Sequence, residues 1–425
     1  MLVNMKKYEV ILLTFALFGE LIFWGFYVLT GRVYGGAGVD NSFSSFMMLV
    51  DIIPLAFFIK YLMSAKSKKN VGLVIAVLLL ILAILLFEAD FSFSFTLVKS
   101  WVAYSIPGAL IGILLAKYDA GDYFAKWLEP IMLFLTAEGI RSMSLILAVS
   151  YTEVNEYGIG VQSLSYYCAF AFAINLYFLL FGNELKDRFK YAQTSIYKAI
   201  SVVLLVVQIV VSLSSGGRGG FVLAVISAAV LVYKKFTKRG SNVLSTSLMF
   251  AMMIAALLVI VSLLPENISD AVSTGSKRTF SYITNEGIDM SQTSNRDDVY
   301  GDAWIDIQKK PILGYGLLMK GSFIEKSWPH NIFLEVLLQG GVVYMIFFLI
   351  VMISLYKKLR LMLKRGHSLF IVTIALYPGV MLLFSGSYIA TELFWFVVSY
   401  IYCYDVKRIP TPVNQYSQEI NLQSR

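Results

Sequence analysis

Cysteine, histidine and charged residues are all scarce in this chain of 425 residues. It has only two cysteines and two histidines. Cys168 and Cys403 lie far apart, within apolar runs, so the sequence indicates neither a disulfide framework nor a thiolate metal site, and redox chemistry is disfavoured. Charged residues make up only 15% of the chain, too few for a soluble globular domain. The chain also lacks a Walker A motif, a GxGxxG turn after a strand and an HExxH motif.

Long apolar runs dominate what is present. Hydrophobic residues make up 58% of the chain, and its mean hydropathy is +0.72. Because a membrane helix needs roughly 20 apolar residues, the sequence predicts an all-α integral membrane protein with about twelve transmembrane helices. The expected spans are 8–29, 41–63, 71–87, 99–117, 127–150, 162–181, 195–213, 220–234, 246–264, 331–355, 368–385 and 388–404. The first run lacks a small-residue cleavage site, so we interpret it as a retained helix rather than a signal peptide.

The basic residues predict the orientation of the chain. They gather in alternate connections, at 60–69, 186–190, 234–239 and 357–365, whereas 88–98 and 151–161 contain acidic residues and no basic ones. The positive-inside rule then puts both termini in the cytoplasm. The net charge of +8 is explained by these helix ends, so it does not indicate nucleic-acid binding.

The division of the chain follows from one long connection. We expect an N-terminal bundle at 1–264, a long external loop at 265–329, three C-terminal helices at 330–405 and a polar cytoplasmic tail at 406–425. Loops of such length are usually functional or disordered.

Part of this loop has the pattern of an amphipathic helix. Ser294 and Asp297 form a capping-box pattern, and Pro311 ends the run. An apolar face at helical spacing could rest on the bundle or at the outer interface. The expected face comprises Val299, Tyr300, Ala303, Trp304 and Ile307.

His330 stands where the external loop meets the tenth apolar run. Pro329 suits a helix entry and Asn331 suits an N-cap. The positive end of a helix dipole disfavours a protonated imidazole, so a neutral His330 could accept a proton as a general base. The alternative is an interfacial histidine that serves only as a polar helix end. His367, the other histidine, is expected in a cytoplasmic loop, away from this face.

Arginines supply the candidate anion-binding groups. Arg218 lies among four glycines in an external turn, where backbone amides and the side chain could contact a phosphate; the alternative is an arginine that reaches for lipid headgroups. Arg296 lies in the first turn of the predicted loop helix, where the dipole disfavours a cation; its alternative role is a salt bridge with Asp297 or Asp298. Arg278 and Lys277 are weaker candidates.

Several acidic residues lie in or near apolar runs, where they often mark functional cavities. Glu335 lies about one turn after Asn331 and is the best candidate for a supporting contact to the site. Glu138 and Arg141 lie three residues apart, so mutual neutralisation is the favoured interpretation. The remaining residues, for which the sequence assigns no role, are Glu20, Asp51 and Glu392.

These external groups comprise one base and several cations, without a metal-binding cluster. The set fits a metal-independent displacement of a phosphate-type leaving group from a lipid, in which arginines hold the diphosphate and His330 deprotonates the attacking hydroxyl.

Three motifs, in order, resemble the O-antigen polymerase and ligase superfamily. The closest match runs from His330 and Asn331 through nine residues to Gly341 and, after two more, Tyr344. "SSGGRGGF" resembles the family's Ser-Arg-Gly turn, although Gly217 stands where a serine often precedes the arginine. "RDDVYGDAWIDIQKKPILGYG" resembles its loop segment. The resemblance covers roughly residues 200–405.

The resemblance implies an inverting, metal-independent glycosyltransferase of the bacterial cytoplasmic membrane that needs no cofactor. It implies an undecaprenyl diphosphate-linked oligosaccharide donor at the outer face, with His330 as base and Arg218 and Arg296 as diphosphate ligands. The products would be O-antigen, capsule or exopolysaccharide, and a chain-length regulator is a possible partner.

The acceptor stays open. We favour a polymerase, because nothing in the chain indicates a lipid A core or protein acceptor; a ligase is the alternative. A flippase of lipid-linked oligosaccharide would need charged residues along a transmembrane path, whereas the candidates here gather on one face. A purely structural membrane subunit would explain neither the ordered motifs nor the external histidine.

Overall fold

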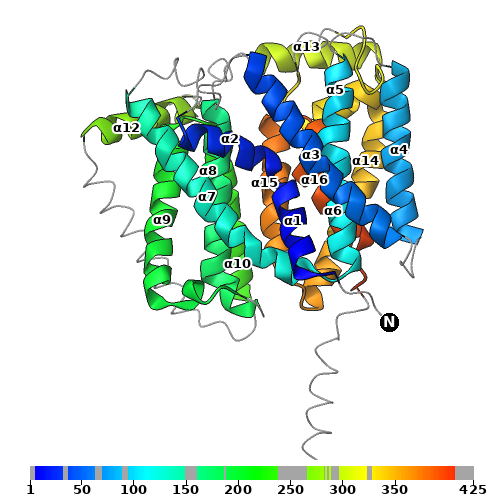
Figure 1. Ribbon diagram of the computed structural model, residues 1–425. Helices are drawn as coiled ribbons and strands as arrows, with labels where there is room; N and C mark the ends of the chain where they lie inside the picture. Colours follow the sequence, from blue (N-terminus) through cyan, green and yellow to red (C-terminus); the bar gives the residue numbers. More distant parts are fainter. Residues whose placement is uncertain are drawn as a thin grey trace, which may run out of the picture.

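The protein is a bundle of upright helices with two helices lying across one end (Figure 1). The computed structural model describes residues 5–31, 37–62, 69–88, 94–148, 160–185, 188–237, 266–281, 283–284, 287–288, 296–322 and 328–406. The predicted span 246–264, the capping residue Ser294 and the tail from 407 onward lie outside these residues.

Helices occupy every predicted span that the structure describes. The first half contains α1 (Lys7–Leu17), α2 (Gly19–Leu29), α3 (Ala37–Leu62), α4 (Lys69–Glu88), α5 (Ser94–Ser100), the π-helix η1 (Trp101–Ser105), α6 (Ile106–Lys117), α7 (Gly121–Ala148) and α8 (Val161–Phe181). The short 3-10 helices η3 (Gly182–Glu184) and η4 (Tyr191–Gln193) lead to α9 (Ser195–Ser214) and α10 (Arg218–Thr237). The rest contains α12 (Glu266–Phe280), α13 (Arg296–Lys309), α14 (Ile332–Lys364), α15 (Phe370–Phe384), η7 (Tyr388–Ala390) and α16 (Glu392–Cys403). A two-residue antiparallel pair, β1 (Ile283–Thr284) and β2 (Gly287–Ile288), is the only sheet in the described part of the chain.

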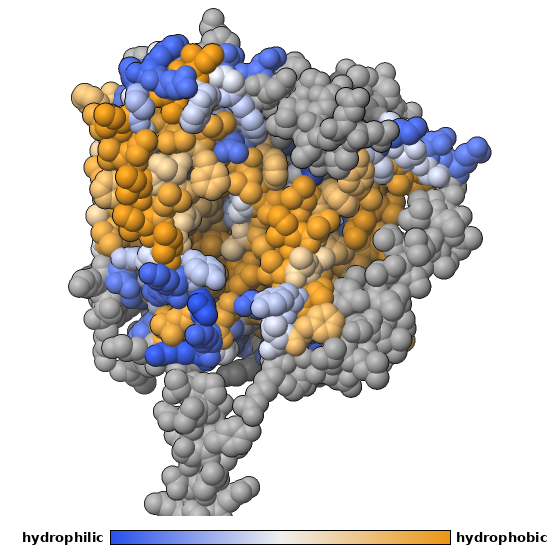
Figure 2. Space-filling view, turned by 180° about the vertical axis from the view of Figure 1, so that it is seen from behind, coloured by the Kyte–Doolittle hydropathy of each residue, from blue (hydrophilic) through white to orange (hydrophobic). Residues whose placement is uncertain are grey.

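The described part is a multi-pass membrane bundle, but it contains fewer full spans than expected. Six segments are long and apolar enough to cross a membrane, and α1 with α2, bent by 68°, makes a seventh if the pair forms one span. Helix α16 has 12 residues, which cover only about 18 Å of a hydrocarbon core about 30 Å thick. The count of twelve spans therefore stays a prediction. Figure 2 shows the expected surface, a broad apolar band between hydrophilic ends.

Helix α8 is the centre of one half of the bundle, where it packs against α7, α9, α10 and α15. In the other half α6 packs against α16. Gly108 and Gly112 lie one turn apart on α6, and a Cβ on either would lie 2.4 Å from a backbone oxygen of α16, at Glu392 and Phe396 respectively. Glycines let these two backbones approach closely, as small residues do in membrane helix pairs.

Helix α14 is broken at its ninth and tenth residues of 33. Gly340 and Gly341 have non-helical backbone angles, and Gly341 has φ +60° and ψ −157°, a conformation that essentially only glycine adopts. The preceding loop fills the break. Tyr315 and Gly316 donate their N–H groups to the carbonyls of residues 338 and 339 at 2.7 and 2.9 Å, and Val342 donates to Pro311 O at 2.8 Å.

Helix α13 confirms the predicted loop helix and the end of that run before Pro311. Ala303 and Ile307 are buried in a small cluster with Met319 and with Leu338 of α14, so the helix rests on the bundle. Trp304, which belongs to the apolar face expected on the bundle or at the outer interface, is 53% exposed and does not pack in this cluster.

The break in α14 gives a first prediction. We expect Gly341→Ala to lower the free energy of unfolding by about 2 kcal/mol, because alanine is strained in this backbone region. Its Cβ would also lie 2.4 Å from the backbone carbonyl of Ile312. Thermal unfolding in detergent measures the effect. Gly379→Ala, in α15 with no atom within 4 Å of the added carbon, is the control, and equal melting temperatures for the two variants would contradict the prediction.

Candidate active site

His330 is the residue immediately before the cap of α14. It is half-buried next to the buried Pro329, and its φ is +51°. A positive φ is uncommon for a residue other than glycine, costs free energy, and occurs most often at functional sites. Helix α14 continues for 33 residues towards the opposite face, so His367, which follows it, is separated from His330 by the thickness of the bundle. Burial lowers the pKa of His367 below its ordinary value, and that residue hydrogen-bonds Tyr400 at 2.9 Å.

Asn331 is the N-cap of α14, as predicted. Its side-chain oxygen accepts the N–H groups of Phe333 and Leu334 at 3.0 and 3.2 Å. Its amide nitrogen donates to Leu383 O, near the end of α15, at 3.2 Å. One side chain therefore closes the first turn of α14 and ties it to a neighbouring helix, which fixes the backbone directly after His330.

Glu335 is fully buried one turn below. Ser387 donates to its carboxylate at 2.5 Å, and Gln339 donates to the same oxygen at 3.3 Å. Gln339 also accepts from Tyr388 and donates to Leu317 O, and the Tyr388 hydroxyl contacts that of Tyr344 at 3.0 Å. Breaking a hydrogen bond in a buried network costs free energy. The network therefore holds α14 in one position against the segment between α15 and α16. The contacts that Glu335 makes to Ser387 and Gln339 therefore stabilise the position of α14, and a supporting contact to the site stays a prediction.

Arg218 is the first residue of α10 and contacts the end of α12. Its guanidinium donates to Arg278 O at 3.2 Å and to Ser281 Oγ at 3.0 Å. Arg278 is exposed, and its side chain also packs at Gly216, where an added Cβ would lie 3.0 Å from Arg278 Cδ. The structure therefore brings together Arg218 and Arg278, two of the three arginines that the sequence singled out. Both cations lie where the positive end of α10 favours an anion.

The glycines around Arg218 mainly serve packing between helices. A Cβ on Gly217 or Gly220 would lie 2.4 or 2.2 Å from atoms of Ser165 in α8, and one on Gly219 would clash with the Tyr166 hydroxyl. These three glycines are therefore explained by packing against α8, and contact of the turn's amides with a phosphate stays a prediction. Only Gly216, with φ +70°, needs glycine for the turn itself.

Arg296 is the first residue of α13, which confirms its expected place in the first turn. Its side chain lies outside the described residues. The starts of α10, α13 and α14 lie at the same end of the bundle, the end that carries α12 and α13 (Figure 1). Helix α10 packs on α15, and α15 in turn is bonded to the cap of α14 through Leu383. Arg218 and His330 are thus linked through one intervening helix.

The expected neutralisation between Glu138 and Arg141 is wrong. Glu138 is fully buried with neither carboxylate oxygen hydrogen-bonded, whereas Arg141 is exposed and donates to Ser144 at 3.2 Å. The two side chains lie in different environments because neighbouring helices cover the side of α7 that carries Glu138 and leave Arg141 exposed. Glu20 and Asp51 are half-buried and Glu392 is buried; their roles stay unassigned.

Two contributions to this face were missed by sequence reasoning. Helix α12 was not predicted, although its Arg278 was noted. Gly275 lets α12 approach the end of α9, since a Cβ there would lie 2.1 Å from Leu213 O.

The second contribution is Glu88, which was interpreted only as an acidic residue of an external connection. It accepts the N–H groups of Leu317 and Leu318 at 3.2 and 2.8 Å. The two glycines that flank Tyr315 were the signal in the sequence for a close contact here. A Cβ on Gly316 would lie 2.5 Å from the Glu88 carboxylate.

The cap of α14 gives the second prediction. We expect Asn331→Ala to destabilise the protein by about 1–2 kcal/mol, because two N–H groups of the first turn and the Leu383 carbonyl lose their partner. Asn331→Ser keeps a capping oxygen, so it should lose distinctly less. Melting temperatures of the purified variants test this, and equal losses for alanine and serine would show that capping is not what Asn331 contributes.

The part of the chain that contains these groups is similar to a known protein family. Residues 200–349 match the family model described as O-antigen ligase. The match confirms the predicted resemblance to the O-antigen polymerase and ligase superfamily, and it includes Arg218, Arg278, Arg296 and His330. No curated protein and no solved structure matches the chain.

Proposed function

We propose, from the similarity of residues 200–349 to O-antigen ligases, that this membrane protein is a glycosyltransferase that polymerises lipid-linked oligosaccharide repeats. The donor is an undecaprenyl diphosphate-linked oligosaccharide, and the acceptor is a sugar hydroxyl of a second lipid-linked repeat. The reaction takes place at the outer face of a bacterial cytoplasmic membrane, with both termini in the cytoplasm. The observation that carries the proposal is the presence of His330 and the Arg218–Arg278 pair at the same end of the bundle.

The chemistry is a single displacement at the anomeric carbon of the donor. The acceptor oxygen forms a bond to that carbon while the bond from the carbon to the diphosphate oxygen breaks, which inverts the configuration. His330 accepts the proton of the attacking hydroxyl, and the electron pair of the broken bond leaves with undecaprenyl diphosphate. A positioned general base of this kind contributes typically about 10²–10⁴-fold in rate.

The arginines stabilise the leaving group. Negative charge develops on the diphosphate as its bond to the sugar breaks, and fixed cations at that position lower the barrier. Arg218 is held at the start of α10 by Ser281 and by the Arg278 carbonyl, so little reorganisation accompanies binding. Arg296 supplies a further cation from the start of α13. No metal or cofactor is required by this scheme.

A ligase is the second candidate, because the matching family model is described by that activity. The same groups would then transfer finished glycan to a lipid A core or a protein. The two reactions share donor, base and leaving group, and they differ only in the acceptor.

The third prediction concerns the chemistry. His330→Ala should lower glycan transfer from a lipid-linked donor by about 10²–10⁴-fold, and Arg218→Ala should also lower it strongly, with normal membrane insertion in both cases. The assay follows release of undecaprenyl diphosphate by purified protein in liposomes. Arg141→Ala, which removes an exposed arginine that donates to Ser144, is the control. Full activity of His330→Ala would refute its role as the base.

The fourth prediction separates the two acceptors. Cells that carry His330→Ala in place of the native protein should lose long surface glycans while single repeats still reach their final acceptor. An electrophoretic ladder of surface glycan shows this. Accumulation of full-length polymer on the undecaprenyl carrier would instead identify a ligase, and an unchanged ladder would contradict both activities.

A further inference from the structure

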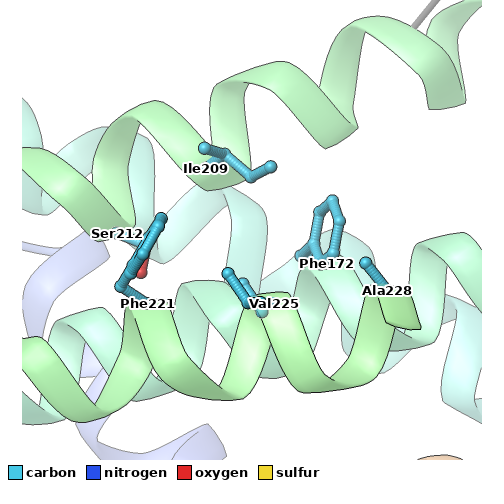
Figure 3. A pocket seen from close by; sticks show the side chains of 7 residues that line it. Phe172, Ile209, Ser212, Phe221, Val225 and Ala228 are labelled. Atoms are coloured by element: carbon cyan, nitrogen blue, oxygen red, sulfur yellow. The ribbon is translucent and has the colours of Figure 1, made fainter. Parts of the chain in front are cut away.

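An apolar groove lies between α8, α9 and α10, directly below the Arg218 end of α10. It has a volume of about 100 Å³. Figure 3 shows Ile209 and Ser212 on one side, Phe221, Val225 and Ala228 on the facing helix, and Phe172 between them. The Ser212 hydroxyl donates to Ser165 O at 3.1 Å, so the only polar side chain in the lining is already occupied.

The groove and Arg218 share one face of α10. Arg218, Phe221, Val225 and Ala228 stand at positions i, i+3, i+7 and i+10, the spacing of a continuous stripe along a helix. At 1.5 Å per residue, the stripe extends about 15 Å from the cation to Ala228. Val225 is 50% exposed, so the groove opens at the side of the bundle, within the apolar band.

Helix α12 flanks the upper end of the groove. The ring of Phe280 packs edge-on against Phe221, with centroids 5.2 Å apart, and Arg278 and Ser281 meet Arg218 beside this contact. Lys277 is a further exposed cation on α12. The groove therefore has a cationic mouth at the membrane surface and an apolar interior, which matches a lipid that joins a phosphate group to a hydrocarbon chain.

We infer that this groove holds the first isoprenoid units of the donor lipid, with the diphosphate at Arg218 and Arg278. The inference rests on the proposed function and specifies where the lipid part of the donor lies. Moving a chain from bilayer into the groove gains little hydrophobic free energy, because both surroundings are apolar. The groove instead selects shape and direction, since close packing favours chains that fit its walls. A chain fixed along α10 holds the bond between sugar and diphosphate at the outer face.

A photoreactive probe tests this placement. The probe is a farnesyl diphosphate with a diazirine on its last isoprene unit, added to the full-length protein in phosphatidylcholine liposomes. We expect mass spectrometry to locate the label on residues 209–228, and excess inorganic pyrophosphate should suppress it. Ala228→Phe should reduce labelling at least about fivefold, because a ring added to the lining fills a cavity of this size.

Ala229→Phe is the matched control, since residue 229 is exposed and does not line the groove. It should leave labelling unchanged. The label map of the unsubstituted protein decides the question even if Ala228→Phe fails to fold. Diphosphate-dependent label elsewhere on the protein would overturn the groove assignment while the proposed function stands. Absence of diphosphate-dependent label, including equal labelling by a farnesol diazirine without the diphosphate, would count against both.

Discussion

The break in α14 is the constraint on which the site depends. A helix interrupted within a membrane bundle leaves backbone N–H and C=O groups that lipid cannot satisfy, so protein must supply their partners. The segment 311–316 does so, with Tyr315, Gly316 and Pro311 bonded on both sides of the break. That segment in turn begins where α13 ends and is followed by the two N–H groups that Glu88 accepts. The segment 311–318 is therefore fixed to α14 and to Glu88, and α13 is placed as a consequence.

The short first part of α14 is held from three directions. Asn331 ties its start to α15, the network around Glu335 ties its middle to Ser387 and Tyr388, and the loop closes its end. Because few residues lie between these attachments, the first part of the helix behaves as one rigid unit. His330 precedes that unit in a left-handed conformation, which surrounding structure must stabilise. The motif that runs from His330 through Gly341 to Tyr344 is thus explained by backbone geometry as much as by chemistry.

Local signals in the sequence predicted local structure well. The capping preference of asparagine located the start of α14, and the helical spacing before Pro311 located α13. Contacts between distant segments carried no such signal. Helix α12 is polar on average and was not recognised, although Ile268, Ala271 and Val272 stand at helical spacing. Trp304 fits a helical stripe yet faces outward, because the packed face is set by Leu338 and Met319. The Glu138–Arg141 assignment failed for the same reason, since spacing within one helix does not reveal which side neighbours cover.

The turn at 216–220 shows how packing and function share the same residues. Its glycines bring α10 against Ser165 and Tyr166 of α8, and this close approach fixes the direction in which Arg218 leaves the helix. With α8 and α15 packed against α10, its remaining faces meet α12 above and the groove towards α9 below. A serine at position 217 would add atoms on the side where Ser165 lies 2.4 Å from an ideal Cβ. The departure from the family pattern at Gly217 is therefore consistent with the close contact between α8 and α10, and the cation keeps its place without the serine.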